Sequence, residues 1–166
     1  MVPSVWQFVW SKQNLHQITK KSGTGVQSQT NFYSYFVMKR LYKNIPIFDE
    51  TISDEEILKV SNSLSNDESW NKIASDFQYA IENLPTSQSE IGRANKYAAQ
   101  AYLAKLRLYQ AYEQGPNHQV TSINKQRLQE VVDLAQAVIA SGKYSLSSDI
   151  ANNFLPETEN GPESIF

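Results

Sequence analysis

The sequence contains no cysteine, and this absence excludes several kinds of chemistry at once. Disulfides, thiolate nucleophiles, cysteine-ligated zinc and a lipid anchor on a cysteine of this chain are all ruled out. The two histidines, His16 and His118, have no carboxylate at metal-ligand spacing, so we predict no metal site. A glycine-rich phosphate loop, a nucleophile elbow and a dinucleotide fingerprint are also missing. We therefore predict no cofactor, no catalytic residue and no enzyme activity.

The chain also lacks an excess of charge of either sign and any long apolar run. It has 15 Lys and Arg against 17 Asp and Glu, for a net charge of -2, which argues against binding to nucleic acid. No window approaches 18 consecutive apolar residues, so no transmembrane helix is predicted. The N-terminal residues lack the pattern of a signal peptide. Either the protein is cytoplasmic or its targeting segment is not in this chain.

The strongest helix signal runs from Gly92 to Tyr112, a stretch rich in Ala, Leu, Lys, Arg and Gln with no proline. On a helical projection most of its circumference is apolar, so we expect it to be covered on several sides. Its narrow polar sector holds Lys96, Gln100, Arg107 and Gln110. Lys105 lies within the apolar arc, where we expect its stem to pack and its ammonium group to reach solvent or a carboxylate.

Apolar residues at helical spacing predict further helices on both sides of this central one. The predicted ranges are Pro3–Lys21, Gln27–Tyr42, a short helix after Ser53, a helix from about Asn66 that Pro85 closes, and Ile123–Ser141. The pairs Ser53 with Glu56 and Ser65 with Glu68 have the spacing of capping boxes. Gly142 is placed to end the last helix in a left-handed conformation. An extended connector is expected at Ile45–Ile47, because Pro46 disfavours helix at the preceding residue.

The three long segments that begin near Asn66, Gly92 and Ile123 are successive candidates for antiparallel packing. We therefore predict an all-α fold of tetratricopeptide-like antiparallel helix pairs, followed by an irregular C-terminal segment. Residues 1–166 are predicted to form a single helical domain. The apolar residues at the C-terminus suggest that the native chain extends beyond it.

Candidates for a binding site are few. Trp6 and Trp10 lie in the aromatic first helix and are the residues that we single out for ligand stacking, although burial in a helix interface is the favoured explanation for them. Acidic residues are scattered along the predicted helices, as Asp76, Glu82, Glu130 and Asp133, and are expected to form a solvated helix face.

Four stretches together resemble the SusD/RagB family of nutrient-binding outer-membrane lipoproteins of Bacteroidetes. The stretches are Phe32–Phe36 with Arg40–Ile47, Ile73–Pro85, Gly92–Lys96 with Ala98–Leu106, and Val138–Leu146 with Glu159–Phe166. Order and spacing agree over about 135 residues. One departure is Lys43-Asn44, where the family usually has Gly-Asp. The family's signal peptide, lipid-bearing cysteine and long C-terminal half have no counterpart here, so the resemblance covers the helical-repeat core.

The resemblance implies a non-enzymatic glycan-binding component of a SusC/SusD-type uptake system. It would be exposed at the surface of the outer membrane and held there only by a lipid anchor that this chain does not contain. Its partners would be a SusC-like TonB-dependent transporter and an oligo- or polysaccharide ligand, with this piece acting as helical scaffold and docking surface. The alternatives are a cytoplasmic helical-repeat adaptor for other proteins and, less favoured, an all-α glycan hydrolase with a pair of carboxylates.

Overall fold

The computed structural model describes residues 26–48, 52–90, 92–115 and 117–165. By its internal contacts the chain divides into two compact units, Met1–Ser69 and Trp70–Phe166. The predicted first helix, with Trp6 and Trp10, lies outside the described residues. The prediction of one domain over residues 1–166 stays a prediction.

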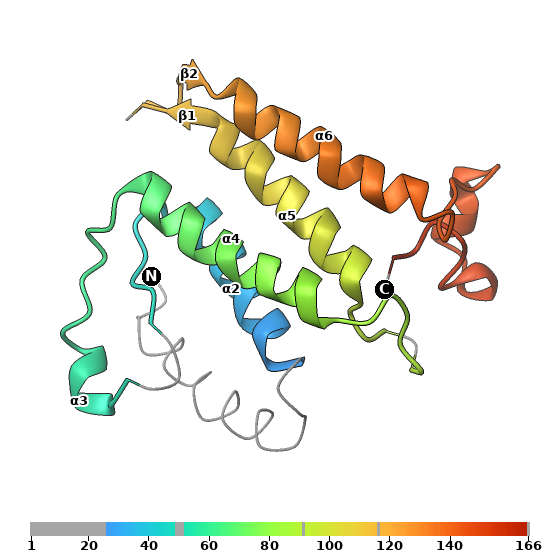
Figure 1. Ribbon diagram of the computed structural model, residues 1–166, viewed down its shortest axis with the longest axis horizontal. Coiled ribbons are helices and arrows are strands. Elements are labelled where there is room, and N and C mark those ends of the chain that lie inside the picture. Colours follow the sequence, from blue (N-terminus) through green and yellow to red (C-terminus); the bar gives the residue numbers. More distant parts are fainter. Residues whose placement is uncertain (1–25, 49–51, 91, 116, 166) are drawn as a thin grey trace. The chain divides into compact units, whose positions relative to one another are not determined.

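The first unit contains helix α2, Val26–Tyr42, as predicted from the aromatic spacing (Figure 1). The residue after it, Lys43, has a left-handed backbone with φ of 59°, and its amide bonds back to the carbonyl of Lys39 at 3.1 Å. The Lys39 ammonium donates to the Lys43 carbonyl, and burial lowers the pKa of Lys39. The predicted connector follows and is neither helix nor strand, and it is fixed to α2 because the Tyr35 hydroxyl donates to the Phe48 carbonyl at 2.8 Å.

Both predicted capping boxes are confirmed. Helix α3, Asp54–Ile57, begins after Ser53, whose hydroxyl accepts from the Glu56 amide while the Glu56 carboxylate accepts from the Ser53 amide. The Ser53 hydroxyl also donates to Glu56 Oε2 at 2.8 Å, and this bond first, then the one from the Ser53 amide, lowers the pKa of Glu56. Ser65 and Glu68 make the same reciprocal pair at the start of helix α4, Asn66–Asn83. Each box satisfies amides that a helix start would otherwise leave unpaired.

The second unit is built on three antiparallel helices, of which α5, Lys96–Ala111, is the middle one (Figure 1). Ring contacts between α4 and α5 show their direction: Trp70 stacks on Tyr109 and Phe77 on Tyr102, so positions rise along one helix as they fall along the other. The side chains of Trp70, Ile73, Phe77, Leu103 and Leu106 are all buried. The predicted antiparallel helix pairs are confirmed.

Helix α5 is shorter than the predicted range of Gly92 to Tyr112. It begins only after Asn95, whose side-chain Oδ1 accepts from the amides of Tyr97 and Ala98 and so caps the helix. Gly92 has φ of 82° and belongs to the turn before the helix. A favourable composition does not extend a helix through a residue that caps it from an extended conformation.

At the other end of α5 the chain enters a short antiparallel hairpin that the sequence analysis did not foresee. Strand β1, Tyr112–Gln114, pairs with β2, Val120–Ile123, and Tyr112 lies opposite Ile123. Helix α6 is Lys125–Ala140, capped by the Asn124 side chain rather than starting at Ile123. The Asn124 amide also donates to the last carbonyl of α5, that of Ala111, at 2.8 Å. The fold remains predominantly helical.

After α6 the chain is irregular, as predicted. Gly142 has φ of 63° and ends the helix in the left-handed conformation. Two short 3₁₀ helices follow, Ile150–Asn153 and Pro156–Thr158. The segment folds back on itself because the Ser145 amide donates to the Pro162 carbonyl at 3.0 Å.

Candidate functional site

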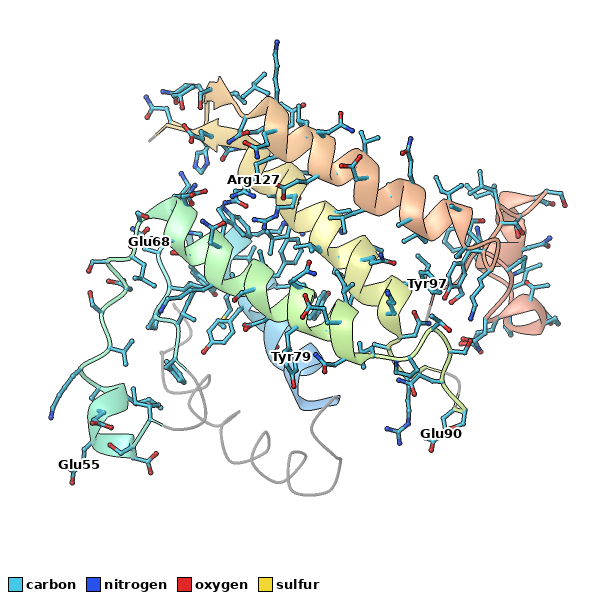
Figure 2. All side chains as sticks on the ribbon, viewed as in Figure 1. Glu55, Glu68, Tyr79, Glu90, Tyr97 and Arg127 are labelled. Atoms are coloured by element: carbon cyan, nitrogen blue, oxygen red, sulfur yellow. The ribbon has the colours of Figure 1, made fainter. Side chains whose placement is uncertain are left out.

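Five side chains from α4, α5 and α6 meet in what we call the inter-helix polar cluster: Asn71, Arg107, Gln110, Arg127 and Glu130. Glu130 receives a guanidinium on each oxygen, with Arg107 Nε 2.9 Å from Oε2 and Arg127 Nη1 2.7 Å from Oε1. Asn71 Oδ1 accepts from Gln110 Nε2 at 2.9 Å and lies within 3.3 Å of both arginines. Figure 2 shows Arg127 reaching from α6 into the space between the helices.

Part of the polar sector predicted for α5 is buried, both inside this cluster and beside it. Gln100 is only 8% exposed and Gln110 only 5%, so these amides face other helices and not solvent. The hydrogen bonds and ion pairs of the cluster offset part of the cost of removing Arg107 and Gln110 from water, although Arg107 Nε, which is paired with Glu130, makes no hydrogen bond within the described residues. Since both Glu130 oxygens are engaged by guanidinium groups, the cluster joins the three helices and does not present an acid and base pair.

A second group of contacts holds the C-terminal segment against the start of α5. Asn95 Nδ2 donates to the Tyr144 hydroxyl at 3.1 Å and to the Ile165 carbonyl at 3.0 Å. The Tyr97 ring meets the Tyr144 ring edge to face at 5.8 Å, and Lys143 Nζ lies 5.7 Å from the Tyr97 ring centre. Tyr97 is labelled in Figure 2, at the end of α5 next to the C-terminal segment.

The same lysine fixes the start of the segment to the loop between α4 and α5. Lys143 Nζ donates to the Thr86 carbonyl at 3.0 Å and to the Ser87 hydroxyl at 2.6 Å. Together these bonds position the irregular segment, which has few regular backbone bonds of its own.

An open hollow of about 600 Å³ lies within this C-terminal segment. Its lining is Asn153, Phe154, Leu155, Pro156, Thr158, Glu159, Asn160, Gly161, Glu163 and Ser164. The Phe154 side chain is 80% exposed, an unusual position for a phenylalanine. Glu163 Oε2 accepts from Asn153 Nδ2 at 2.7 Å and from the Ser147 amide at 3.2 Å. The Asn153 bond first, and then the Ser147 bond, lower the pKa of Glu163.

The residues singled out from sequence have different outcomes. Trp6 and Trp10 lie outside the described residues, so their assignment stays a prediction. The Lys105 side chain is exposed, as expected. Glu82 and Asp133 each accept a hydrogen bond from a glutamine one turn earlier on the same helix. Among the described residues no group of three or more His, Cys, Asp or Glu is placed to hold a metal ion.

No helix in the described part of the chain combines the length and the apolar character that a membrane crossing needs.

Comparison with known proteins identifies relatives of this chain in sequence and in structure. No protein-family model matches it. A curated relative, SusD-like protein P2 of Formosa agariphila, is 33% identical over 76 residues, which are 46% of this chain and 15% of that protein. A solved SusD-like protein of Bacteroides fragilis superposes with a TM-score of 0.70 and 25% identity, over 86% of this chain and 26% of its own. The chain therefore resembles SusD-like proteins in sequence and in fold.

A further solved structure, a SusD-like carbohydrate-binding protein of Bacteroides fragilis, shares the fold. It has a TM-score of 0.71 and 20% identity, and the match covers 93% of this chain and 29% of that one. The chain thus spans between a quarter and a third of the length of these two solved relatives. The resemblance read from the four sequence stretches is confirmed.

Sequence reasoning missed the polar cluster and the hollow. The cluster joins three helices through hydrogen-bond partners that are up to 56 positions apart, and nothing in the local spacing of Asn71 or Arg127 points to it. Phe154 gave a weak signal, because a phenylalanine between Asn153 and Leu155 in a segment without helical period has no predicted partner.

Proposed function

We propose that this SusD-like chain is part of a non-catalytic glycan-binding protein in a SusC/SusD-type uptake system. The observation that carries the proposal is the agreement in helix arrangement over 86% of the chain with a SusD-like protein at 25% identity. Support for a glycan ligand comes from a second relative, which is named as carbohydrate-binding. The three relatives reported above favour this proposal over a cytoplasmic adaptor.

In this proposal the three antiparallel helices are a scaffold. The inter-helix polar cluster and the stacked ring pairs fix α5 between its neighbours, and the contacts of Asn95 hold the irregular segment at one end. Preorganisation of this kind reduces the ordering entropy that ligand binding costs. The chemistry required is recognition of hydroxyl groups and sugar faces, for which amides, carboxylates and exposed aromatic rings are suited.

We propose further that the protein acts at the outer-membrane surface, anchored by a lipid, and that its helices contact a SusC-like TonB-dependent transporter. One surface fits such a contact: Tyr112, Val120 and Ile123 lie on the same face of the β1–β2 hairpin, and each is more than a third exposed. Exposed apolar side chains gathered on one face commonly mark protein contacts.

The test of glycan binding is affinity electrophoresis of the complete protein in gels that contain one polysaccharide each. We expect retardation by at least one polysaccharide, with no new reducing ends after long incubation. Migration that no polysaccharide changes would contradict the binding proposal, and release of reducing ends would contradict the absence of catalysis.

The test of the transporter contact is co-purification from native membranes after mild solubilisation. Ile123→Glu introduces a charge on the hairpin face and is expected to reduce recovery of the transporter. Thr121→Glu, on the same strand but not paired in register with β1, is the matched control. If neither the parent protein nor Thr121→Glu brings down a transporter, the result would argue against the proposed partner.

A further inference from the structure

We propose that the hollow in the C-terminal segment is a subsite for a neutral sugar unit, with the Phe154 ring as the surface on which the sugar lies. This inference rests on the proposed glycan-binding function and assigns it to named residues. The hollow, at about 600 Å³, is within the range of small-molecule sites. It is large enough for a sugar ring with its first hydration waters.

Phe154 is the apolar element of this subsite. It lies between the two 3₁₀ helices and is 80% exposed. The free energy of the system falls when an apolar surface covers an aromatic ring that was exposed to water. The C–H face of a pyranose is such a surface, and it leaves the hydroxyl groups at its rim directed to polar neighbours.

Glu163 is the polar element. Its Oε2 accepts from Asn153 Nδ2 and the Ser147 amide, which fix the position of the carboxylate. Within the described residues, Oε1 of Glu163 accepts no hydrogen bond. It is therefore available for a sugar hydroxyl, and charge-assisted bonds of this kind are stronger than neutral ones.

The charge of the lining selects among glycans. Of the ten residues, Glu159 and Glu163 are acidic and none is basic. Two carboxylates without a cation repel uronates and sulfate esters, so a neutral glycan is the class of ligand that fits. Asn153 and Asn160 add amide groups, which can both donate to and accept from hydroxyls.

The test is isothermal calorimetry on the complete protein with neutral malto-, xylo-, manno- and laminari-oligosaccharides and with anionic alginate oligosaccharides. We expect a neutral series to bind, and Phe154→Ala to weaken that binding about tenfold. Phe154→Tyr, which keeps an aromatic face, is expected to restore most of the affinity. Leu146→Ala is the matched control, because Leu146 is 84% exposed in the same segment and does not line the hollow.

The outcomes separate this inference from the proposed function. If neutral oligosaccharides bind the parent and Phe154→Ala equally, the subsite is overturned while glycan binding stands. If none of the series binds while a polysaccharide retards the protein in the gels, the subsite is overturned and glycan binding stands; if neither experiment shows binding, both are overturned. Stronger binding of alginate than of every neutral series would also overturn the subsite. A large loss of thermal stability in Phe154→Ala, with none in Leu146→Ala, would identify the ring as a packing element and overturn its ligand role.

Discussion

Asn95 Nδ2 donates a hydrogen bond to the Tyr144 hydroxyl at 3.1 Å, across 49 positions of the sequence. The same side chain caps α5 through its other atom, Oδ1. The side-chain amide of Asn95 thus caps the first turn of α5 and also holds the C-terminal segment beside this helix. This double use explains why the helix starts at Lys96 and where the irregular segment is fixed.

The two roles of Asn95 can be separated by substitution. Asn95→Asp retains an oxygen that caps the helix but replaces the donor to Tyr144 and Ile165 with an acceptor, so we expect a loss of about 1–2 kcal/mol in unfolding free energy. Asn95→Ala also removes the cap and should lose about 1 kcal/mol more. Urea unfolding measures both values. Hydrogen exchange should rise in residues 144–165 for Asn95→Asp, and also in the first turn of α5 for Asn95→Ala. Equal exchange patterns in the two variants would contradict this division.

Lys43 occupies a backbone conformation that glycine adopts more easily. Its φ is 59°, and the residue stands where the resemblance to SusD-like sequences expects glycine. Lys43→Gly should raise the unfolding free energy by about 0.5–1 kcal/mol, since relief of the left-handed strain exceeds the added entropy of the unfolded chain. Gly142→Ala, at φ of 63°, is the reciprocal control and should lower it by about 1 kcal/mol. A decrease in the urea midpoint for Lys43→Gly would show that the lysine side chain contributes more than its backbone costs.

The inter-helix polar cluster should contribute more than an exposed ion pair does. Glu130→Gln removes the charge that Arg107 and Arg127 share and leaves both guanidinium groups partly buried, so we expect a loss of about 1–3 kcal/mol. Glu90→Gln, at the exposed pair with Arg93, is the control and should change stability by less than about 0.5 kcal/mol. Denaturant unfolding at low and high salt compares them. Similar small effects from both substitutions would mean that the cluster adds no net stability.

Hydrogen bonds lower the pKa of Glu163, and this gives a pH dependence with a defined sign. A carboxyl group whose pKa is lower in the folded chain contributes stability above its unfolded value near 4.5, and that contribution is lost as the pH falls through the folded value. Asn153→Ala removes the largest cause, so the pKa of Glu163 should rise toward 4.5. Titration of the Glu163 carboxyl carbon by NMR measures it. Asn152→Ala is the control because the hydrogen bonds of Asn152 use its backbone, and a pKa of Glu163 that is the same in both variants would contradict the assignment.

The sequence predicted the elements whose cause is local. The capping boxes at Ser53 and Ser65, the end of α4 before Pro85 and the left-handed Gly142 were all correct, because a cap or a turn depends on residues within one helical turn of it. The two ends of α5 were wrong. At its start Asn95 caps the helix although a helix-favouring composition runs through it, and at its end Tyr112 leaves the helix to pair with Ile123.

For the site, the sequence by itself determined the chemical inventory: no cysteine, two histidines and a generous supply of aromatic rings. Tertiary structure alone decided which groups meet. In the folded chain Gln110 contacts Asn71, and Arg107 contacts Glu130. Phe154 stays exposed and lines the same hollow as Glu163. Spacing along a chain fixes the face of a helix on which a side chain stands, but the partner of that face comes from another helix. Long-range packing therefore decides whether a polar face is solvated or buried and whether an apolar ring is core or surface.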